Sequence, residues 1–246
     1  MDHLVYVAAS GASGAMLAQA ANSHNLANAS TVGFRADLMM AQQAGASYQR
    51  LESRAYAGMQ NTGVDFREGV INSTGRDLDV AIQGSGWMVV QTPDGGEAYT
   101  RRGDLRVNEL GQITNGAGQA LMGNSGPIAL PPFSSINIGA DGTISIVPVG
   151  ESPSTLAVVD RVKLVNPDRA LLTKGENGMI QLPEGEEADA DAAVKLISGS
   201  LESSNVDSVS AMVQMIELAR GFENHIKMTK IAEQLDAAST ELMSLS

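Results

Sequence analysis

The chain has 246 residues, which is enough for one large domain or two smaller ones. Its formal net charge of −12 makes nucleic acids and anionic membrane surfaces poor partners, because both are bound by clusters of Lys and Arg. The chain contains no cysteine, which excludes disulfides, thiolate metal sites and cysteine nucleophiles.

The N-terminal region lacks the pattern of a cleaved signal peptide. No Lys or Arg precedes Arg35, and polar residues interrupt the apolar stretch. No apolar run approaches the roughly 20 residues that a membrane span needs. We therefore expect no membrane insertion, and either a cytoplasmic protein or one that is exported without a cleaved leader.

Residues 3–28 are predicted to form a helix with a narrow stripe of small side chains. The stripe follows the 4-3-4-3 spacing of a coiled-coil seam and consists of Leu4, Ala8, Gly11, Ala15 and Ala18. Such a face buries little area for each residue, but it lets another helix approach closely. Because so thin an apolar face makes an isolated helix marginal, we expect a helical partner.

The run NSHNLANASTVGFRA, residues 22–36, is predicted to contain the end of this helix and the turn that follows it. Asn25 and Asn28 can bond the unpaired helix carbonyls, neighbouring backbone or an adjacent subunit. Gly33 permits a sharp change of direction, and Phe34 is expected to anchor the chain beyond the turn.

Residues 70–180 have the sequence features of strands and turns. Glycine is frequent there, helical periodicity is absent, and the segment GRDLDVAIQG alternates apolar Leu78, Val80 and Ile82 with polar residues. A Pro-Asp-Gly turn separates the strand-like runs that follow. This pattern predicts an antiparallel β domain inserted between helices at the two ends of the chain.

Residues 205–245 are predicted to form a longer helix, capped by Ser204 or Asn205 and with Asp207 in its first turn. Its apolar residues form two successive seams that slip near Ile226. The first seam contains Val209, Val213, Ile216, Ala219, Phe222 and Ile226, and the second contains Met228, Ile231, Leu235, Ala238, Leu242 and Leu245.

The predicted fold class is α+β, with long N- and C-terminal helices that pack together in a coiled-coil-like manner, and an inserted antiparallel β domain. We expect three parts along the chain. They are a terminal helical domain (1–35 and 205–246), connecting segments (36–70 and 190–204) and a β-rich domain (71–189).

Candidate chemistry is weak throughout the sequence. Ser23 and His24 cannot act as a nucleophile and base, because adjacent helical residues point about 100° apart. The histidines share no metal-ligand spacing, so no metal or cofactor is expected. Asp77 and Asp79 lie on one face of a predicted strand, but no substrate-binding aromatics accompany them, and an exposed hairpin face is the better interpretation. We expect no enzyme.

Three separated runs resemble the flagellar rod and hook proteins. They are NLANASTVGFRA near the N-terminus, TGRDLDVAIQGSGWMVVQTPDGGEAYTRRGDLRVNELGQI (residues 74–113), and GSLESSNVDSVSAMVQMIELARGFENHIKM (residues 199–228). The resemblance covers nearly the whole chain, with the runs in the family's order. The start Met-Asp-His-Leu and the pair Gly86-Trp87 are more similar to proximal-rod members than to distal-rod members.

The resemblance implies a structural subunit of the periplasmic rod of the bacterial flagellar basal body. Such subunits pass unfolded through the flagellar type III export apparatus, assemble with copies of themselves and with other rod proteins, and form a drive shaft for the hook and filament. The resemblance also implies terminal segments that become ordered on assembly. We expect subunit interfaces on the two terminal helices, at Leu4, Ala8, Gly11, Ala15, Ala18, Asn25, Asn28, Val209, Val213, Ile216, Phe222, Ile226, Ile231 and Leu235.

Three alternatives stay open on the sequence alone. The chain could be another flagellar axial protein, such as a distal-rod subunit. It could be a periplasmic enzyme, such as a peptidoglycan hydrolase that uses Asp77 or Asp79. A soluble β-rich binding module of the periplasm is the third.

Overall fold

The computed structural model describes residues 2–45, 55–152, 155–175, 178–183 and 186–244. The chain divides into two compact units. Unit 1 contains Met1–Ala29, Asp37–Asp65 and Val206–Ser246, and unit 2 contains Ser30–Ala36 and Phe66–Asn205.

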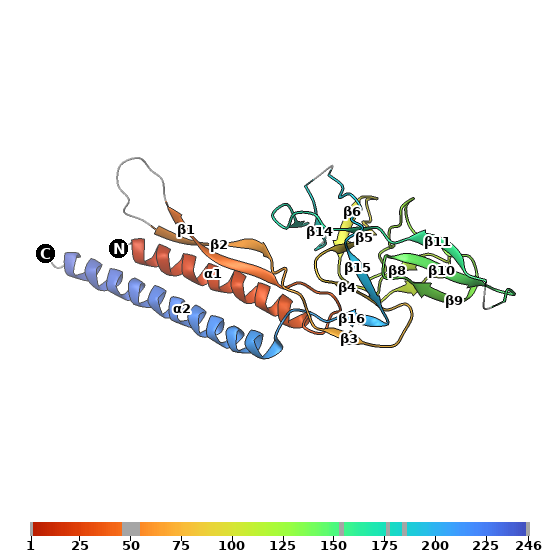
Figure 1. Ribbon diagram of the computed structural model, residues 1–246. Coiled ribbons are helices and arrows are strands. Elements are labelled where there is room, and N and C mark those ends of the chain that lie inside the picture. The colour runs from red at the N-terminus through yellow and green to blue at the C-terminus, as the bar shows by residue number, and fades with distance from the viewer. Residues whose placement is uncertain (1, 46–54, 153–154, 176–177, 184–185, 245–246) are drawn as a thin grey trace. The chain divides into compact units, whose positions relative to one another are not determined.

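The described residues of unit 1 form two helices and one β-hairpin. Its elements are α1 (Asp2–Ala27), β1 (Asp37–Gly45), β2 (Ala55–Val64) and α2 (Ser208–Ser244). The helices lie side by side (Figure 1) and run antiparallel, because Asn22 bonds the carbonyl of Ala211 while Gly11 meets His225. The hairpin contacts α1 along the side that faces away from α2 in Figure 1.

The start of α2 is set by a side-chain cap. The Asp207 carbonyl accepts the first helical hydrogen bond from Ala211 N, at 2.9 Å. Its carboxylate accepts hydrogen bonds from Val209 N (3.1 Å) and Ser210 Oγ (2.5 Å), which satisfies backbone and side-chain donors of the first turn. The predicted caps, Ser204 and Asn205, are therefore wrong, and the helix begins three residues later.

Unit 2 is built from short strands. The strands are β3 (Ile71–Ser73), β4 (Val80–Gln83), β5 (Trp87–Gln91), β6 (Glu97–Thr100), β7 (Arg106–Val107), β8 (Ile113–Thr114), β9 (Phe133–Ile138), β10 (Thr143–Pro148), β11 (Ala157–Arg161), β12 (Leu164–Val165), β13 (Thr173–Lys174), β14 (Ile180–Gln181), β15 (Lys195–Ser198) and β16 (Ser200–Glu202). They form a five-stranded sheet β12-β5-β6-β14-β13, a three-stranded sheet β11-β10-β9 and the pairs β15-β4, β16-β3 and β7-β8. The pairings are antiparallel, and the pairs β15-β4 and β16-β3 place the end of the segment beside its beginning.

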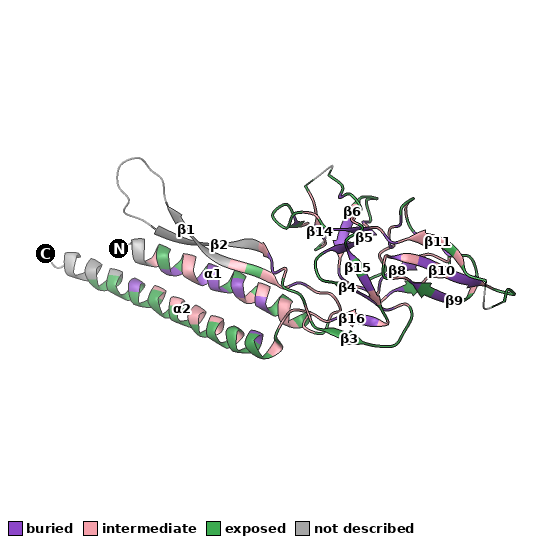
Figure 2. Cartoon of the chain, in the orientation of Figure 1, coloured by how far each residue is buried: buried purple, intermediate pink, exposed green. Residues whose placement is uncertain are grey.

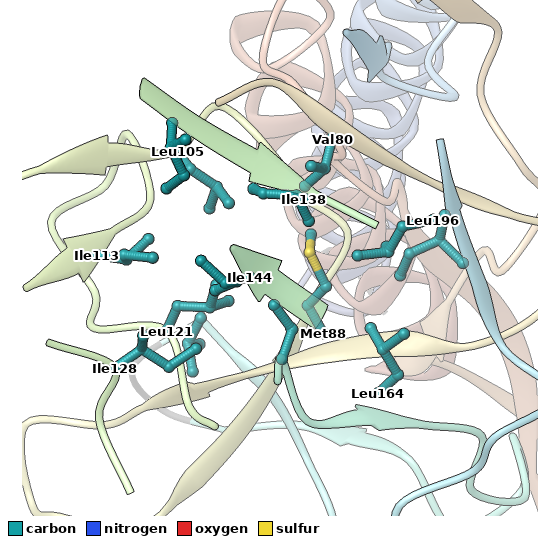
Figure 3. Packing of buried hydrophobic residues seen from close by; sticks show 14 of the residues in the cluster. Val80, Met88, Leu105, Ile113, Leu121, Ile128, Ile138, Ile144, Leu164 and Leu196 are labelled. Atoms are coloured by element: carbon teal, nitrogen blue, oxygen red, sulfur yellow. The ribbon is translucent and has the colours of Figure 1, made fainter. Parts of the chain in front are cut away.

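Aliphatic side chains form the core of unit 2. Figure 3 shows labelled side chains from β4, β5, β8, β9, β10, β12, β15 and the loops between them converging on one another. Met88, Leu105, Ile113, Leu121 and Ile144 are each 0% exposed. With aromatic residues only 4% of the chain, interdigitated Val, Ile, Leu and Met supply most of the burial that holds these strands together.

The predicted fold class needs correction. The described residues are α+β, with one helix at each end and a strand-rich middle. The terminal helices do not form the expected coiled-coil-like pair, because α1 also packs against the β1–β2 hairpin and the predicted seam on α2 is exposed. The strand-rich middle lies within one compact unit, in which the strands form several small antiparallel sheets and pairs.

The segment expected to connect the domains contains regular structure. β1 and β2 both lie within residues 36–70, and they pair along their full length with one irregularity between Leu38 and Met39. The predicted domain boundaries themselves stay predictions. The strand expected at GRDLDVAIQG begins only at Val80, and Asp79 is buried where an exposed face was expected.

Candidate assembly surfaces

The stripe of small residues on α1 is buried within unit 1. Ala8 is 1% exposed, Ala15 and Ala18 are each 8% exposed, and Gly11 is half-buried. A methyl group at Gly11 would overlap the imidazole of His225 on α2. The side chain of Leu4, the first predicted residue of the stripe, lies outside the described residues. Close approach of the two helices therefore depends on the absence of a side chain at Gly11.

The face of α2 that meets α1 was missed by the sequence analysis. The buried and half-buried residues recur at intervals of four and three, as Ala211, Met215, Leu218, Phe222, His225, Thr229 and Ala232. Of the residues predicted to pack, only Phe222 belongs to this face. The polar residues His225 and Thr229 within it concealed the repeat from a search for apolar spacing.

The predicted seam of α2 instead lies on its outside. We define the outer α2 surface as the exposed residues Val209, Met212, Val213, Ile216, Ile226, Met228, Ile231 and Leu235, which are 38–66% exposed. Figure 2 shows α2 coloured largely as exposed over its described length. Full burial of one Val, Ile or Leu side chain contributes about 1.5–3 kcal/mol. Burial of a single methylene-sized group, which is close to the size of an alanine side chain, contributes roughly 0.8 kcal/mol. The outer α2 surface thus offers more hydrophobic free energy than the alanine-rich contact inside the unit.

A second exposed apolar face lies on α1. Tyr6, Val7, Met16 and Leu17 are 49–68% exposed. The helix sequence DHLVYVAASGASGAMLAQAANSHNLA contains no Lys or Arg. Helix faces in water normally carry charged residues, so an uncharged, partly apolar face indicates a surface that a partner covers.

Polar side chains at the end of α1 bond backbone within unit 1. Asn25 is fixed by two hydrogen bonds with Asp37, from Asn25 Nδ2 to the Asp37 carbonyl (2.9 Å) and from Asp37 N to Asn25 Oδ1 (2.8 Å). Asn28 Nδ2 donates to the His24 carbonyl at 3.0 Å, and His24 Nδ1 lies 2.7 Å from the Asp37 carboxylate. These contacts hold the start of β1 against the last turns of α1. A role for Asn25 and Asn28 in contacts between subunits stays a prediction.

The turn at Gly33 belongs to unit 2. Its φ of 65° lies in the left-handed region, and a side chain there would overlap the backbone of Arg101. Phe34 is half-buried, and the Lys174 ammonium lies 5.6 Å from the centre of its ring.

A buried ion cluster in unit 2 was also missed by the sequence analysis. Glu202 accepts hydrogen bonds from Arg35 Nη2 (2.5 Å) and Arg101 Nη1 (3.1 Å), and all three side chains are at most 3% exposed. Burial lowers the pKa of Arg101, and the charge of Glu202 opposes that shift. Both arginines also lie against the ring of Trp87. The available signal was that Arg35 and Glu202 are charged residues inside the runs GFRA and GSLESSN.

The carboxylates considered for acid–base chemistry do not form a site. Asp77 is exposed, whereas Asp79 is buried, accepts a hydrogen bond from Thr74 Oγ1 (2.7 Å) and lies 3.1 Å from Arg76 Nε. Within the described part of the chain, no three His, Asp or Glu side chains gather as metal ligands would. Neither described helix is both long enough and apolar enough to span a membrane.

Comparisons with known proteins show which family models and which proteins the chain is similar to. Residues 81–146 match the family model of the flagellar hook protein FlgE/F/G D1 domain, and residues 197–242 match that of the flagellar basal body rod FlgEFG protein C-terminal region. The chain is 39% identical, over 252 residues and 100% of both chains, to the flagellar basal-body rod protein FlgF of Salmonella typhimurium and to that of Escherichia coli. It is 31% identical to the flagellar basal-body rod protein FlgG of Buchnera aphidicola from Schizaphis graminum, over 87% of this chain and 89% of that one.

Proposed function

This chain belongs to the FlgF family of flagellar basal-body rod proteins and is a structural subunit of that rod, and we propose that it lies in the proximal rod and transmits motor torque toward the hook and filament. Members of the family assemble with other rod proteins. Repeated contacts that do not close into a ring generate a helical tube, and torque then passes through many packed contacts in parallel.

The exposed apolar faces of the helices are the observation that carries this proposal. The outer α2 surface and the Tyr6, Val7, Met16 and Leu17 face of α1 stay in water when the chain is alone. Neighbouring subunits would bury them, which makes assembly favourable without any catalytic or cofactor group. The predicted interface residues Val209, Val213, Ile216, Ile226, Ile231 and Leu235 contribute through this outer surface.

The stripe on α1 contributes differently in this proposal. The contact between α1 and α2 is made on α1 by Ala8, Gly11, Ala15 and Ala18. These residues would fix the geometry of the helix pair, and other residues on its outside would contact the neighbouring subunits. The terminal helical domain (1–35 and 205–246) would supply contacts between subunits in the inner layer, and the β-rich domain (71–189) would contact axial neighbours.

Export and the lack of enzymatic activity belong to the same proposal. We propose that the chain passes unfolded through the flagellar type III apparatus, for which an absence of cysteine is favourable because no disulfide can form in transit. A hydrolase that uses Asp77 or Asp79 is less well supported, because Asp79 is engaged by Thr74 and Arg76 and Asp77 is an exposed single carboxylate.

Charge placed on the outer α2 surface tests the proposal. Val213→Asp should abolish swimming and stop rod assembly, because a carboxylate would be buried at the subunit contact without a partner. The isolated protein should keep its helical circular dichroism, since exposed substitutions usually change stability by no more than about 0.5 kcal/mol. Gln214→Asp adds the same charge at the neighbouring exposed position and is the matched control.

Electron micrographs of isolated basal bodies provide the measurement. Rods that assemble normally with Val213→Asp and also with Ile216→Asp would rule out the outer α2 surface as a subunit contact. Equal loss with Gln214→Asp would show that added charge alone, and not burial at Val213, blocks assembly.

A further inference from the structure

The chain passes between its two units at residues 29/30, 36/37, 65/66 and 205/206. The parts of unit 2 next to these crossings are residues 30–36, 66–71 and 202–205. Force passed along the chain from unit 1 must enter unit 2 through these segments. The contacts between these segments and the β core therefore determine how rigidly the chain is held at the crossings.

Backbone hydrogen bonds join the three segments to one another. Gly33 N donates to the Glu202 carbonyl (2.8 Å), Ser203 N donates to the Val70 carbonyl (2.9 Å), and Asn205 N donates to the Phe34 carbonyl (3.3 Å). Residues 71 and 202 are partners in the β3–β16 pair. The three segments thus form one small hydrogen-bonded layer.

The Glu202 side chain joins this layer to the core. Its Oε1 accepts hydrogen bonds from Arg35 Nη2 (2.5 Å) and Gly69 N (2.8 Å), so one oxygen holds two of the segments. Its Oε2 accepts from Arg101 Nη1 (3.1 Å), and Arg101 Nη2 donates to the Gly84 carbonyl (2.6 Å) in the turn between β4 and β5. Besides the backbone that continues from these segments into β3 and β16, this carboxylate connects the layer to the turn between β4 and β5.

The only tryptophan of the chain completes the cluster. Trp87 is 4% exposed, with the guanidinium carbons of Arg35 and Arg101 at 5.9 and 5.4 Å from its ring centre and the ring of Phe66 edge-on at 5.9 Å. Among the described residues, Arg35 Nε and Nη1 and Arg101 Nε have no hydrogen-bond partner. Contact with the aromatic face compensates part of that desolvation.

The cluster contains two positive charges and one negative charge, so the loss of each member has a different cost. Two buried guanidinium groups share one buried carboxylate. Removing Glu202 leaves two neighbouring buried cations without their buried anion, whereas removing Arg35 leaves a balanced Glu202–Arg101 pair. Glu202 is accordingly the member whose loss removes side-chain anchoring from all three segments at once.

We propose that Glu202, through Arg35, Arg101 and Gly69 N, is a clamp that fixes all the chain crossings of unit 2 to its β core and so makes the path of force between the units stiff. The clamp is a property of the single chain. Only its consequence in the cell rests on the proposed role in the rod.

Amide hydrogen exchange on the isolated full-length protein tests the clamp. Glu202→Gln should raise exchange at Gly33 and Ser203 by at least about tenfold, although their own hydrogen bonds are to backbone, and should change core amides such as Leu121 by less than about twofold. Quenching of Trp87 fluorescence by acrylamide should increase in the same variant. Glu97→Gln, which removes the charge from the part-buried Glu97–Lys163 ion pair (2.5 Å) away from the crossings, is the matched control and should leave exchange at Gly33 and Ser203 unchanged.

Two results overturn the clamp: unchanged exchange at Gly33 and Ser203, or an equal rise in the core, which would mean general loss of stability. If Glu202→Gln does not fold, Arg35→Met decides. A rise confined to residues 33–36 supports the clamp, and no rise or a rise throughout unit 2 refutes it. Because these measurements use the monomer, their failure leaves the proposed rod function standing. Normal rod assembly with Val213→Asp and Ile216→Asp would contradict the proposed subunit contact and would leave the clamp standing.

Discussion

At the residue scale, position 207 shows how one side chain sets the end of a long element. The Asp207 carboxylate bonds Val209 N and Ser210 Oγ, and these hydrogen bonds lower its pKa from the ordinary 3.8. Its negative charge also lies at the N-terminus of α2, where the helix dipole favours an anion. The carboxylate form is therefore preferred by the folded helix.

This preference predicts a pH dependence at the start of α2. A carboxyl group whose folded pKa is lowered contributes stability that is present above its unfolded pKa, near 3.8, and is lost as the pH falls through the lower folded value. The amide resonances of Val209 and Ser210 should move toward random-coil values as the pH falls below 3.8. Asp207→Asn should remove the pH step but keep the cap, because Asn is an equally good neutral cap. A step that persists in Asp207→Asn would assign it to another group.

At the scale of elements, α1 and α2 approach closely because their contact face lacks large side chains. Gly11 sits against the imidazole of His225, and Ala8, Ala15 and Ala18 are buried on the same side of α1. Small residues bring two helices together at the cost of buried area, so the pair has a specific geometry and modest stability. Any side chain at Gly11 must push the helices apart or displace the imidazole.

Gly11→Leu is therefore expected to stop rod assembly while unit 2 stays folded. The leucine cannot be accommodated beside His225, and the outer surface of the helix pair would lose its shape. Swimming assays and basal-body micrographs measure assembly, and Trp87 fluorescence reports on unit 2. Gly221→Ala is the control on α2, because a methyl group there meets nothing within 4 Å and raises helix propensity by about 1 kcal/mol. Normal motility with Gly11→Leu would contradict close packing at this position.

At the scale of the whole molecule, the two units hold their shape in different ways. Unit 2 buries a continuous aliphatic cluster from many strands, whereas the helix pair of unit 1, where its side chains are described, is packed through small side chains and leaves large apolar ones in water. Large aliphatic side chains bury more apolar area each, so unit 2 has the larger hydrophobic contribution to its stability. If neighbouring subunits cover the terminal helices, as we propose, the helices gain the burial that they lack as a monomer.

The free subunit is accordingly expected to exchange its amide protons unevenly. About the first 30 and the last 40 residues should exchange rapidly, because local opening exposes few buried apolar contacts there, and the core strands of unit 2 should exchange slowly. Mass spectrometry of deuterated peptides from the monomer and from isolated rods would measure the difference. Uniform protection in the monomer would refute ordering on assembly.

The sequence by itself determined the features that depend on neighbouring residues. Periodicity located a helix at each end, the Gly and Ala spacing identified the buried stripe of α1, and alternation with turn residues located the strand-rich middle. The three runs that resemble rod and hook proteins indicated the family, which the comparisons confirmed.

Only the tertiary structure decided the features that depend on residues far apart in the chain. Apolar residues recur at helical spacing on more than one side of α2, so the spacing could not tell the face that meets α1 from the face left exposed. The β1–β2 hairpin has no clear alternation, and its place follows from packing on α1. The Glu202 clamp joins residues 167 and 101 positions apart, and a charge becomes a buried partner only when folding brings its counter-charge to it and removes the water.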